Sequence, residues 1–458
     1  MGATCRSPRI EQKRLQEAII SISPQRRQEI IDALRRGTVP RTSLDAFAVG
    51  LERFESVVDE ELQKVGCGGS VFKAVRGEYG CGKTFFSRWL ADRARKSGFA
   101  TAEVQISETE TPLYRLETVY RRMMEQLSTV DRAFGALQNI VDAWFFALEE
   151  DVLAEGKFGP DDQENLVART AELLEQRLAR VSATAPAFSM ALRGYRSAQA
   201  VGDRATAQGI LAWLAGQPNV AAAVKRTANV KGDLDHFGAL SFLQGNLTIL
   251  RDCGYPGLLV VLDEVETIQR MRSDARDRSL NALRQLIDEV DSGRLPGLYL
   301  LITGTPSFFD GPQGIHRLEP LAQRLHVDLQ SDPRFDNPRA VQIRLPAFNL
   351  ERLCQVGCRV RDIFQEHSNA AGRIGSLCDD GYVRDLAEAV AGRFGGKIGL
   401  APRVYLKKLV ADVLDRVDQF PEFDPRHNYS LTIREAELTS IERQAVGASD
   451  VDEIELDS

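Results

Sequence analysis

The sequence predicts an α/β fold with three parts: a parallel sheet core, a large helical insertion within that core, and a C-terminal helical lid. Short unbroken apolar runs, such as residues 258–262, are typical of parallel strands buried on both faces. A glycine-rich loop joins another such run to a helical pattern, as in phosphate-binding α/β proteins. Residues 128–255 are rich in Ala, Leu, Glu, Arg and Gln, with helical periodicity and few strand signals.

The composition is that of a globular protein and excludes a strongly basic nucleic-acid coat protein. The chain has 458 residues, of which 43% are apolar and 27% charged, and its net charge is −7. Its longest clean apolar runs are far shorter than the roughly 20 residues of a membrane helix, and the N-terminus lacks the apolar core of a secretion signal. Seven scattered cysteines do not indicate a disulfide framework. We therefore expect a cytoplasmic protein without a membrane partner.

Residues 1–40 are predicted to form an N-terminal helical arm. The helical pattern ends at the breaker sequence GTVP. Two arginine pairs, at positions 26–27 and 35–36, lie within the pattern. These pairs either occupy a solvated helix face or contact nucleic acid or a partner protein.

A phosphate-binding loop is predicted at residues 77–84. Their sequence, GEYGCGKT, matches G-x-x-x-x-G-K-[ST], with a β-type run before it and a helical pattern after it. Glycines let the backbone direct N–H groups at phosphate oxygens, at the positive end of the following helix. Lys83 would reach the β- and γ-phosphates, and the Thr84 hydroxyl would ligate Mg²⁺. The residues expected around a nucleotide are Gly77, Glu78, Tyr79, Gly80, Cys81, Gly82, Lys83, Thr84 and Phe85.

A second acidic site is predicted where the apolar run 258–262 ends in Asp263 and Glu264. Open α/β sheets bind their ligands at the carboxyl ends of the strands. Asp263 would hold Mg²⁺ directly or through water, and Glu264 would polarise an attacking water. Glu266, a further carboxylate, has no assigned role.

A third apolar strand, residues 298–302, is followed by Thr303 and Thr305. A hydroxyl at the tip of a strand beside the acidic strand is placed to sense the γ-phosphate or to hold water. The sequence does not choose between the two threonines, and a simple turn is the alternative.

The remaining core is predicted in two pieces, residues 41–127 and 256–346, on either side of the insertion. Residues 101–107 have a strand pattern, and an amphipathic helix follows Pro112. Residues 341–345 are the last short strand.

The lid is predicted at residues 347–420, in three helical segments, and the last of these begins at Pro402, a residue favoured in the first turn. Arg403 follows it and is placed to reach a phosphate from the lid. Arg324 is placed to reach the nucleotide of a neighbouring subunit. The guanidinium group suits both tasks because it stays charged and binds phosphate through two nitrogens. The alternative for each arginine is a surface ion pair.

The net charge of the chain is concentrated in residues 421–458, predicted as an acidic tail. These residues carry ten acidic and three basic side chains, a balance equal to the net charge of −7 of the whole chain. The body of the protein is therefore neutral. The tail is either solvated or a docking or DNA-mimicking segment.

The order of these motifs resembles that of AAA+ ATPases, and the lid and the TGTP strand end are most similar to those of origin-recognition and initiator ATPases. Over about residues 26–418 the chain also resembles the BREX-system ATP-binding protein family of anti-phage defence. The segments that carry this resemblance are ALRRGTVP (33–40), AVGLERF (48–54), VRGEYGCGKTFF (75–86), ETPLYRLETVYR (110–121), LDEVETI (262–268) and APRVYLKKLV (401–410).

This resemblance implies a cytoplasmic bacterial ATPase encoded near a helicase-like partner. It also implies that Lys83 and Thr84 contact nucleotide and magnesium, that Asp263 and Glu264 serve the metal and the water, and that Arg403 is the lid sensor. More than one arginine between positions 305 and 345 fits the role of acting on a neighbour.

We therefore expect a homo-oligomeric ATPase, with ATP and Mg²⁺ as ligands, that couples nucleotide state to assembly on double-stranded DNA or with a helicase or methyltransferase. One alternative is a nucleotide-gated regulatory scaffold with little hydrolysis. Another is an initiator-like DNA-loading protein, although residues after 420 show no clear winged-helix pattern.

Overall fold

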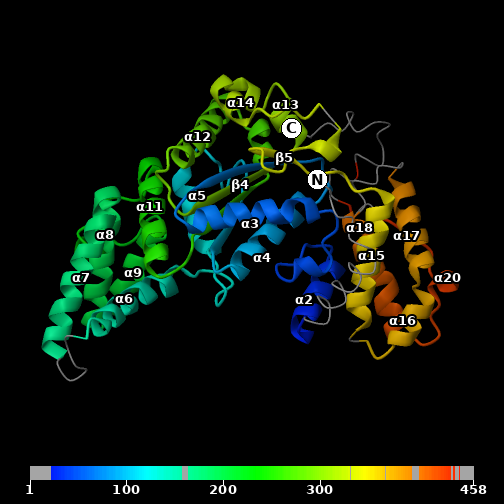
Figure 1. Ribbon diagram of the computed structural model, residues 1–458, viewed down its shortest axis with the longest axis horizontal. Coiled ribbons are helices and arrows are strands. Elements are labelled where there is room, and N and C mark those ends of the chain that lie inside the picture. The colour runs from blue at the N-terminus through cyan, green and yellow to red at the C-terminus, as the bar shows by residue number, and fades with distance from the viewer. Residues whose placement is uncertain are drawn as a thin grey trace, which may run out of the picture.

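The structure, a computed structural model, describes residues 22–156, 163–330, 332–366, 368–394, 402–434, 437, 438 and 443. Its centre is a five-stranded parallel sheet with the strand order β2-β3-β4-β1-β5 (Figure 1). The strands are β1 (Val71–Arg76), β2 (Ala100–Gln105), β3 (Leu258–Asp263), β4 (Leu298–Gly304) and β5 (Gln342–Arg344). The predicted α/β class with a parallel sheet is confirmed.

Both faces of the sheet are buried, as the unbroken apolar runs predict. In β3, the side chains of Leu258, Val260 and Leu262 pack in one core cluster. Those of Leu259 and Val261 pack in a second cluster, because successive side chains of a strand point to opposite faces. The helices of the first face are α5 (Leu116–Gln126), α11 (His236–Asp252) and α12 (Ser273–Asp291). Those of the second are α3 (Glu52–Gly66) and α4 (Lys83–Lys96).

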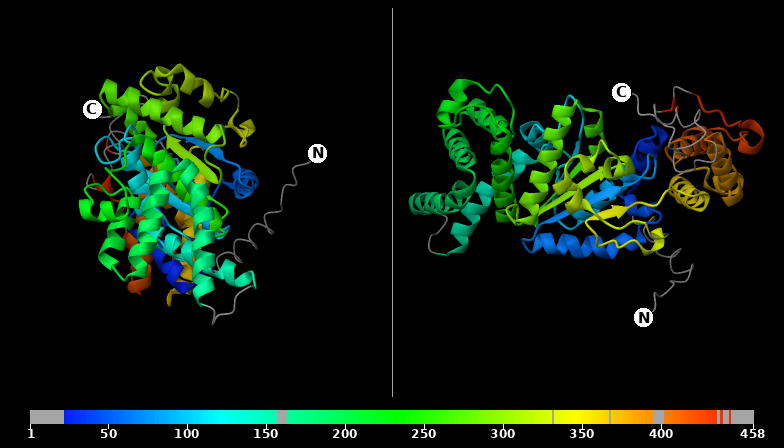
Figure 2. Two further views of the ribbon diagram at one scale, coloured as in Figure 1. Left: turned by 90° about the vertical axis from the view of Figure 1, so that its left-hand side faces the viewer. Right: turned by 90° about the horizontal axis from the view of Figure 1, so that it is seen from above.

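Between α5 and β3 the chain forms a helical region that extends beyond the sheet (Figure 1). Seen from above, these helices lie at one end of the molecule, with the sheet in the middle (Figure 2). They are α6 (Leu137–Ala154), α7 (Gln163–Thr184), α8 (Pro186–Ala200), α9 (Arg204–Leu214) and α10 (Ala222–Thr227), followed by α11. The predicted preponderance of helix in residues 128–255 agrees with these elements.

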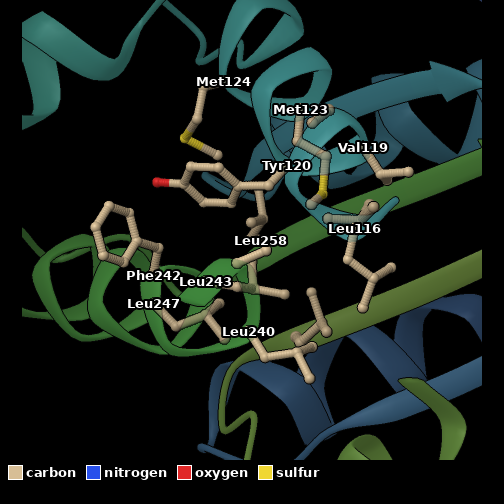
Figure 3. Packing of buried hydrophobic residues seen from close by; sticks show 14 of the residues in the cluster. Leu116, Val119, Tyr120, Met123, Met124, Leu240, Phe242, Leu243, Leu247 and Leu258 are labelled. Carbon is tan, nitrogen blue, oxygen red and sulfur yellow. The ribbon is translucent and has the colours of Figure 1, made fainter. Parts of the chain in front are cut away.

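The helical region joins the core through the packing of α11 on α5. Tyr120 of α5 lies among apolar side chains of α5, α11 and β3 (Figure 3). Its hydroxyl donates to the carbonyl of Leu214 at 2.8 Å and accepts from Nδ2 of Asn246 at 2.6 Å. Since Tyr120 is fully buried, these two bonds satisfy a polar group that would otherwise destabilise the joint.

The opposite end of the molecule is a second group of helices, at the position predicted for the lid (Figure 2). The helix predicted from Pro402 onward is not uniform, since its middle, η6, is a π-helix. A further short helix, α16, was not predicted. The elements are α15 (Leu350–Gln365), α16 (Ala371–Leu377), α17 (Asp380–Arg393), α18 (Pro402–Lys407), η6 (Lys408–Leu414) and α19 (Asp415–Gln419).

The N-terminal helix α2 (Pro24–Arg35) packs on these lid helices. Ser23 caps its first turn and Pro24 begins it, both favoured at a helix start. The Arg35 guanidinium binds both carboxylate oxygens of Asp415, at 2.6 and 2.7 Å, and Arg27 pairs with Glu366. The sequence left the role of both arginine pairs open, and in the structure one arginine of each pair, Arg27 and Arg35, contacts the lid. The remainder of the predicted arm, residues 1–21, lies outside the described residues.

Part of the chain predicted as an acidic tail also packs on the lid. Helix α20 (Pro425–Asn428) follows α19, and Leu438 is buried in the lid-side cluster. Nζ of Lys408 contacts both carboxylate oxygens of Glu437 at 2.9 Å. This segment is therefore packed rather than solvated, while residues 444–458 lie outside the described residues.

The remaining short elements connect the strands to these layers. They are η1 (Leu44–Ala46), η2 (Val265–Arg270), α13 (Pro306–Asp310), η3 (Ile315–Arg317), α14 (Glu319–Leu325) and η4 (Pro333–Phe335).

Candidate functional site

The glycine-rich loop connects the end of β1 to the start of α4. Gly82 has a φ of 95°, a left-handed conformation that disfavours residues with a side chain. Gly77 has another constraint, because a Cβ at this position would lie 2.3 Å from Sγ of Cys81. Within the described structure no side chain caps the first turn of α4. The N–H groups at this positive helix end therefore suit an anion.

Lys83, at the start of α4, directs its ammonium back into the loop. Its Nζ donates to the carbonyls of Gly77 at 2.8 Å and Glu78 at 3.3 Å. The same nitrogen lies 5.0 Å from the ring centroid of Tyr79, and the Lys83 side chain is buried. The loop thus holds a positive charge at its centre.

Asp263, at the end of β3, accepts hydrogen bonds from two threonines. Thr84 Oγ1 donates to Oδ2 of Asp263 at 3.1 Å, and the Thr303 hydroxyl donates to Oδ1. The Thr303 hydroxyl in turn accepts from the backbone N–H of Glu264 at 3.2 Å. Thr305 is not part of this cluster, since its hydroxyl contacts Ser307 at 2.9 Å. Of the two threonines that the sequence left open, Thr303 is therefore the one beside the acidic residues.

Glu264 has an unusual backbone and a fixed side chain. Its φ is 60°, uncommon for a residue other than glycine. Its Oε2 accepts a hydrogen bond from Nε2 of Gln105, at the end of β2, with a distance of 2.8 Å. The carboxylate predicted to polarise water is therefore bound to the neighbouring strand.

Glu266, which the sequence left without a role, is buried beside the same site. Its exposed fraction is only 3%, and its Oε2 has no hydrogen-bond partner within the described part of the chain. Burial raises the pKa of this carboxyl to about 7, although the nearby Lys83 charge opposes the shift.

A cavity of about 300 Å³ brings these groups together. Its polar end is formed by the loop, Asp263, Glu264 and Glu266. Its apolar part includes Phe47 and Phe85, whose ring centroids are 5.3 Å apart. The remaining lining comes from the segment after α2, the segment after β5, and the lid: Leu34, Gly37, Thr38, Val39, Pro40, Val49, Gly50, Leu51, Leu345, Pro346, Phe348, Arg352, Val356, Pro402, Arg403 and Leu406.

The two predicted arginines occupy different surroundings. Arg403 lines the cavity, and its Nη2 donates to the carbonyl of Glu437 at 2.8 Å. Arg324 is outside the cavity lining and pairs through Nε with Asp288 of α12 at 2.6 Å. Arg352 of α15 lines the cavity although it was not among the predicted residues. Charged residues are common on amphipathic helices, so the sequence does not indicate that Arg352 faces the cavity.

The residues that line the cavity are suited to bind a nucleoside triphosphate together with Mg²⁺. The ammonium of Lys83 is held by backbone carbonyls, which a phosphate oxygen can replace. Mg²⁺ binds through one or two carboxylates together with phosphates and water. The Thr84–Asp263 pair supplies one carboxylate and one hydroxyl, and uncapped N–H groups face the same space.

An α/β protein with a parallel sheet, a glycine-rich loop around a buried lysine and a cavity of this size belongs to the class of nucleotide-binding proteins. The particular family is shown by comparison: the chain belongs to the family described as BREX system ATP-binding protein BrxC/D, whose model matches residues 22–433. The chain is thus an ATP-binding protein of the BREX antiviral defence system, and the resemblance expected from its sequence is confirmed.

Two other comparisons, with curated proteins and with solved structures, gave no match. Among the helices that the structure describes, none is both long and apolar enough to span a membrane.

Proposed function

We propose that the chain is a P-loop ATPase of the AAA+ type that binds Mg-ATP in the cavity and hydrolyses it. The observation that carries this proposal is the contact between Thr84, which follows the loop lysine, and Asp263 at the end of a neighbouring strand. The strand order supports it, because β1 lies beside β4 and β4 beside β3. This order brings the loop and the acidic strand end to the same edge of the sheet.

The cavity lining favours one orientation of the nucleotide. The adenine ring would lie in the apolar part near Phe47, Phe85 and Phe348. The triphosphate would extend toward the loop, where Lys83 exchanges its two carbonyl partners for phosphate oxygens. Bound Mg²⁺ would neutralise charge on the β- and γ-phosphates, and Thr84 and Asp263 would hold it.

Hydrolysis requires a residue that orients or activates water for attack on the γ-phosphate. In this proposal Glu264 has that role once it leaves Gln105, and Thr303 keeps the backbone of Glu264 in position. Arg403 would bind phosphate from the lid. Arg324 would leave Asp288 to reach the nucleotide of an adjacent subunit in a homo-oligomer.

Two substitutions test binding and hydrolysis separately. Lys83→Ala removes charged hydrogen bonds to phosphate, each of which contributes about 1.5–3 kcal/mol. We expect ATP affinity to fall by roughly 100-fold, measured by calorimetry. Glu264→Gln should bind ATP yet slow its turnover by roughly 100-fold or more. Wild-type turnover in the Glu264 variant would remove this carboxylate from the mechanism.

A nucleotide-gated scaffold with little hydrolysis is the second candidate function. It is favoured by the contacts of two catalytic groups, since Glu264 is bound to Gln105 and Arg403 to the carbonyl of Glu437. A single-turnover assay of the purified chain separates the two functions. ATP bound without cleavage over many minutes, with or without DNA, would favour the scaffold.

We further propose that nucleotide state controls assembly on double-stranded DNA or with a helicase or methyltransferase of the same defence system. The membership of the chain in a defence family supports this coupling. The ATPase rate with and without double-stranded DNA tests it. A direct DNA contact should also weaken steeply with salt, because counterions are released when phosphates are bound.

A further inference from the structure

Among the described residues, the carboxyl of Glu266 is a buried polar group with an oxygen that makes no hydrogen bond. It lies in η2, three residues after Asp263, and lines the polar end of the cavity. It is 3% exposed, and its Oε2 has no hydrogen-bond partner among the described residues. A buried oxygen without a partner costs free energy. Within the described ranges, three carboxyl groups line the cavity, those of Asp263, Glu264 and Glu266. Of these, only Glu266 has no role in the sequence motif or in the proposed mechanism.

The groups around Glu266 determine its charge. Burial disfavours the ionised carboxylate most strongly, and the negative charges of Glu264 and Asp263 add to that effect. The ammonium of Lys83 acts in the opposite direction. The balance leaves the Glu266 pKa at about 7, so that in the free protein the carboxyl carries a proton about half of the time near neutral pH.

Two other titratable groups that face the cavity, Tyr79 and Cys81, stay uncharged in this range. Burial raises the pKa of Tyr79 to about 12 and also raises the pKa of the Cys81 thiol, so both stay neutral. Arginine side chains also lie in this region. Those that line the cavity or contact Tyr79 are Arg270, Arg352 and Arg403.

We propose that Glu266 enters the ATP complex as a neutral carboxylic acid and donates a hydrogen bond to a phosphate oxygen. This inference rests on the proposed function, namely that a triphosphate binds beside Lys83. The phosphates bring negative charge close to Glu266 and engage the Lys83 ammonium, whose charge favours ionisation of Glu266 in the free protein. Glu266 therefore takes up a proton from solvent, and its unpartnered oxygen gains an acceptor.

The sign of the pH dependence follows from linkage. Above neutral pH the free protein has lost the Glu266 proton, whereas the complex keeps it. Binding then consumes up to one proton, and the ATP affinity falls by up to about tenfold for each pH unit. Mg-ATP itself does not titrate in this range.

The experiment is calorimetric titration of the full chain with Mg-ATP between about pH 7 and about pH 9, in two buffers of different ionisation enthalpy. Wild-type protein should take up close to one proton at the upper end of this range, and its affinity should decline with pH. Glu266→Gln keeps the shape and a hydrogen-bond donor but carries no charge. It should bind ATP with no proton uptake and, at high pH, more tightly than wild type.

Glu60→Gln is the matched control, because Glu60 is an exposed carboxylate that pairs with Arg339 on the surface. This variant should keep the wild-type pH dependence. Wild-type ATP binding without proton uptake would overturn the inference and leave the ATPase proposal intact. An unchanged pH slope in Glu266→Gln would overturn it too. Absence of ATP binding to wild type at every pH would instead refute the proposed function itself.

Discussion

At the scale of single residues, the site depends on hydroxyl groups that orient one carboxylate. Asp263 accepts bonds from Thr84 on one oxygen and from Thr303 on the other. A carboxylate restrained on both oxygens presents a fixed geometry and loses little conformational entropy when a cation binds. Its charge is also spread over charge-assisted bonds, which are stronger than neutral ones.

Removing one of these hydroxyls should weaken Mg-ATP binding. Thr303→Val keeps the side-chain shape but deletes the bond to Asp263 and one of the two acceptors of the Glu264 N–H, the other being Oδ1 of Asp263. Loss of a charged hydrogen bond costs about 1.5–3 kcal/mol. We expect a decrease of at least about tenfold in Mg-ATP affinity by calorimetry.

Thr305→Val is the natural control for this substitution. Thr305 is also buried, but its hydroxyl contacts Ser307 rather than the acidic residues. Its ATP affinity should stay within about twofold of wild type. Equal losses in both variants would show that Thr303 acts only through folding.

The two buried hydrogen bonds of Tyr120 lead to a prediction about the free energy of unfolding. Tyr120→Phe leaves the carbonyl of Leu214 and one donor of Asn246 without a partner in the buried joint between α5 and α11. The cost should be about 1–3 kcal/mol, read from the midpoint of urea unfolding. Tyr114→Phe, at a partly exposed position of the same segment, should change stability by less than about 0.5 kcal/mol.

The sequence predicts individual site residues well where they belong to a motif of neighbouring residues in the chain. The loop at 77–84 and the pair Asp263–Glu264 follow from a fixed order of residues along the chain. The bond between Gln105 and Glu264 joins residues far apart in sequence, and no pattern announces it. The same holds for Glu266, whose burial results from the packing of several segments.

At the scale of elements, the core strands were predictable because burial on both faces leaves unbroken apolar runs. The run 258–262 is β3 almost to the residue. A helical segment is predicted from Pro402 onward, and residues 408–414 within it form a π-helix. A π-turn depends on tertiary packing as well as periodicity, so apolar spacing alone does not reveal it.

The packing of α2 on the lid was not predictable either, although α2 itself was. Arg35 and Asp415 are 380 residues apart in sequence and form a bidentate pair. After α2, several residues between Gly37 and Leu51 line the cavity, among them Val39 and Phe47. The Arg35–Asp415 ion pair thus connects the lid with a segment that lines the cavity.

Breaking this pair should affect ATP binding from outside the cavity. Asp415→Asn removes the charge that holds Arg35 and should increase hydrogen exchange in α2. Because the pair is partly exposed, we expect a loss of about 1 kcal/mol at most and an ATP affinity reduced by a few fold. Asp32→Asn, which removes only the neighbouring pair within α2, is the control. Equal exchange rates in α2 of both variants would disprove the connection.

At the scale of the whole molecule, the sheet lies between the helical region and the lid (Figures 1 and 2). The composition and the motif order indicated these parts, because periodicity differs between strands and helices. Their spatial arrangement could not be predicted, since it depends on which faces the helices bury. In the structure, α5 and α11 bury theirs against β2, β3 and each other.

A homo-oligomer formed around ATP should be visible in solution. Sedimentation velocity of the wild type with Mg-ATP is expected to show a larger species than without nucleotide. Lys83→Ala should remain at the nucleotide-free size, because the change depends on binding. An identical profile with and without ATP would remove the support for assembly and for a role of Arg324 across subunits.

The helices between α5 and β3 leave and rejoin the core on a single face of the sheet. The strand order and the cavity therefore do not depend on how many helices this region contains. A change in the length or number of these helices would therefore leave the edge of the sheet that borders the cavity in place. A fold built in this way separates the ATP-binding core from the surface that the helical region presents.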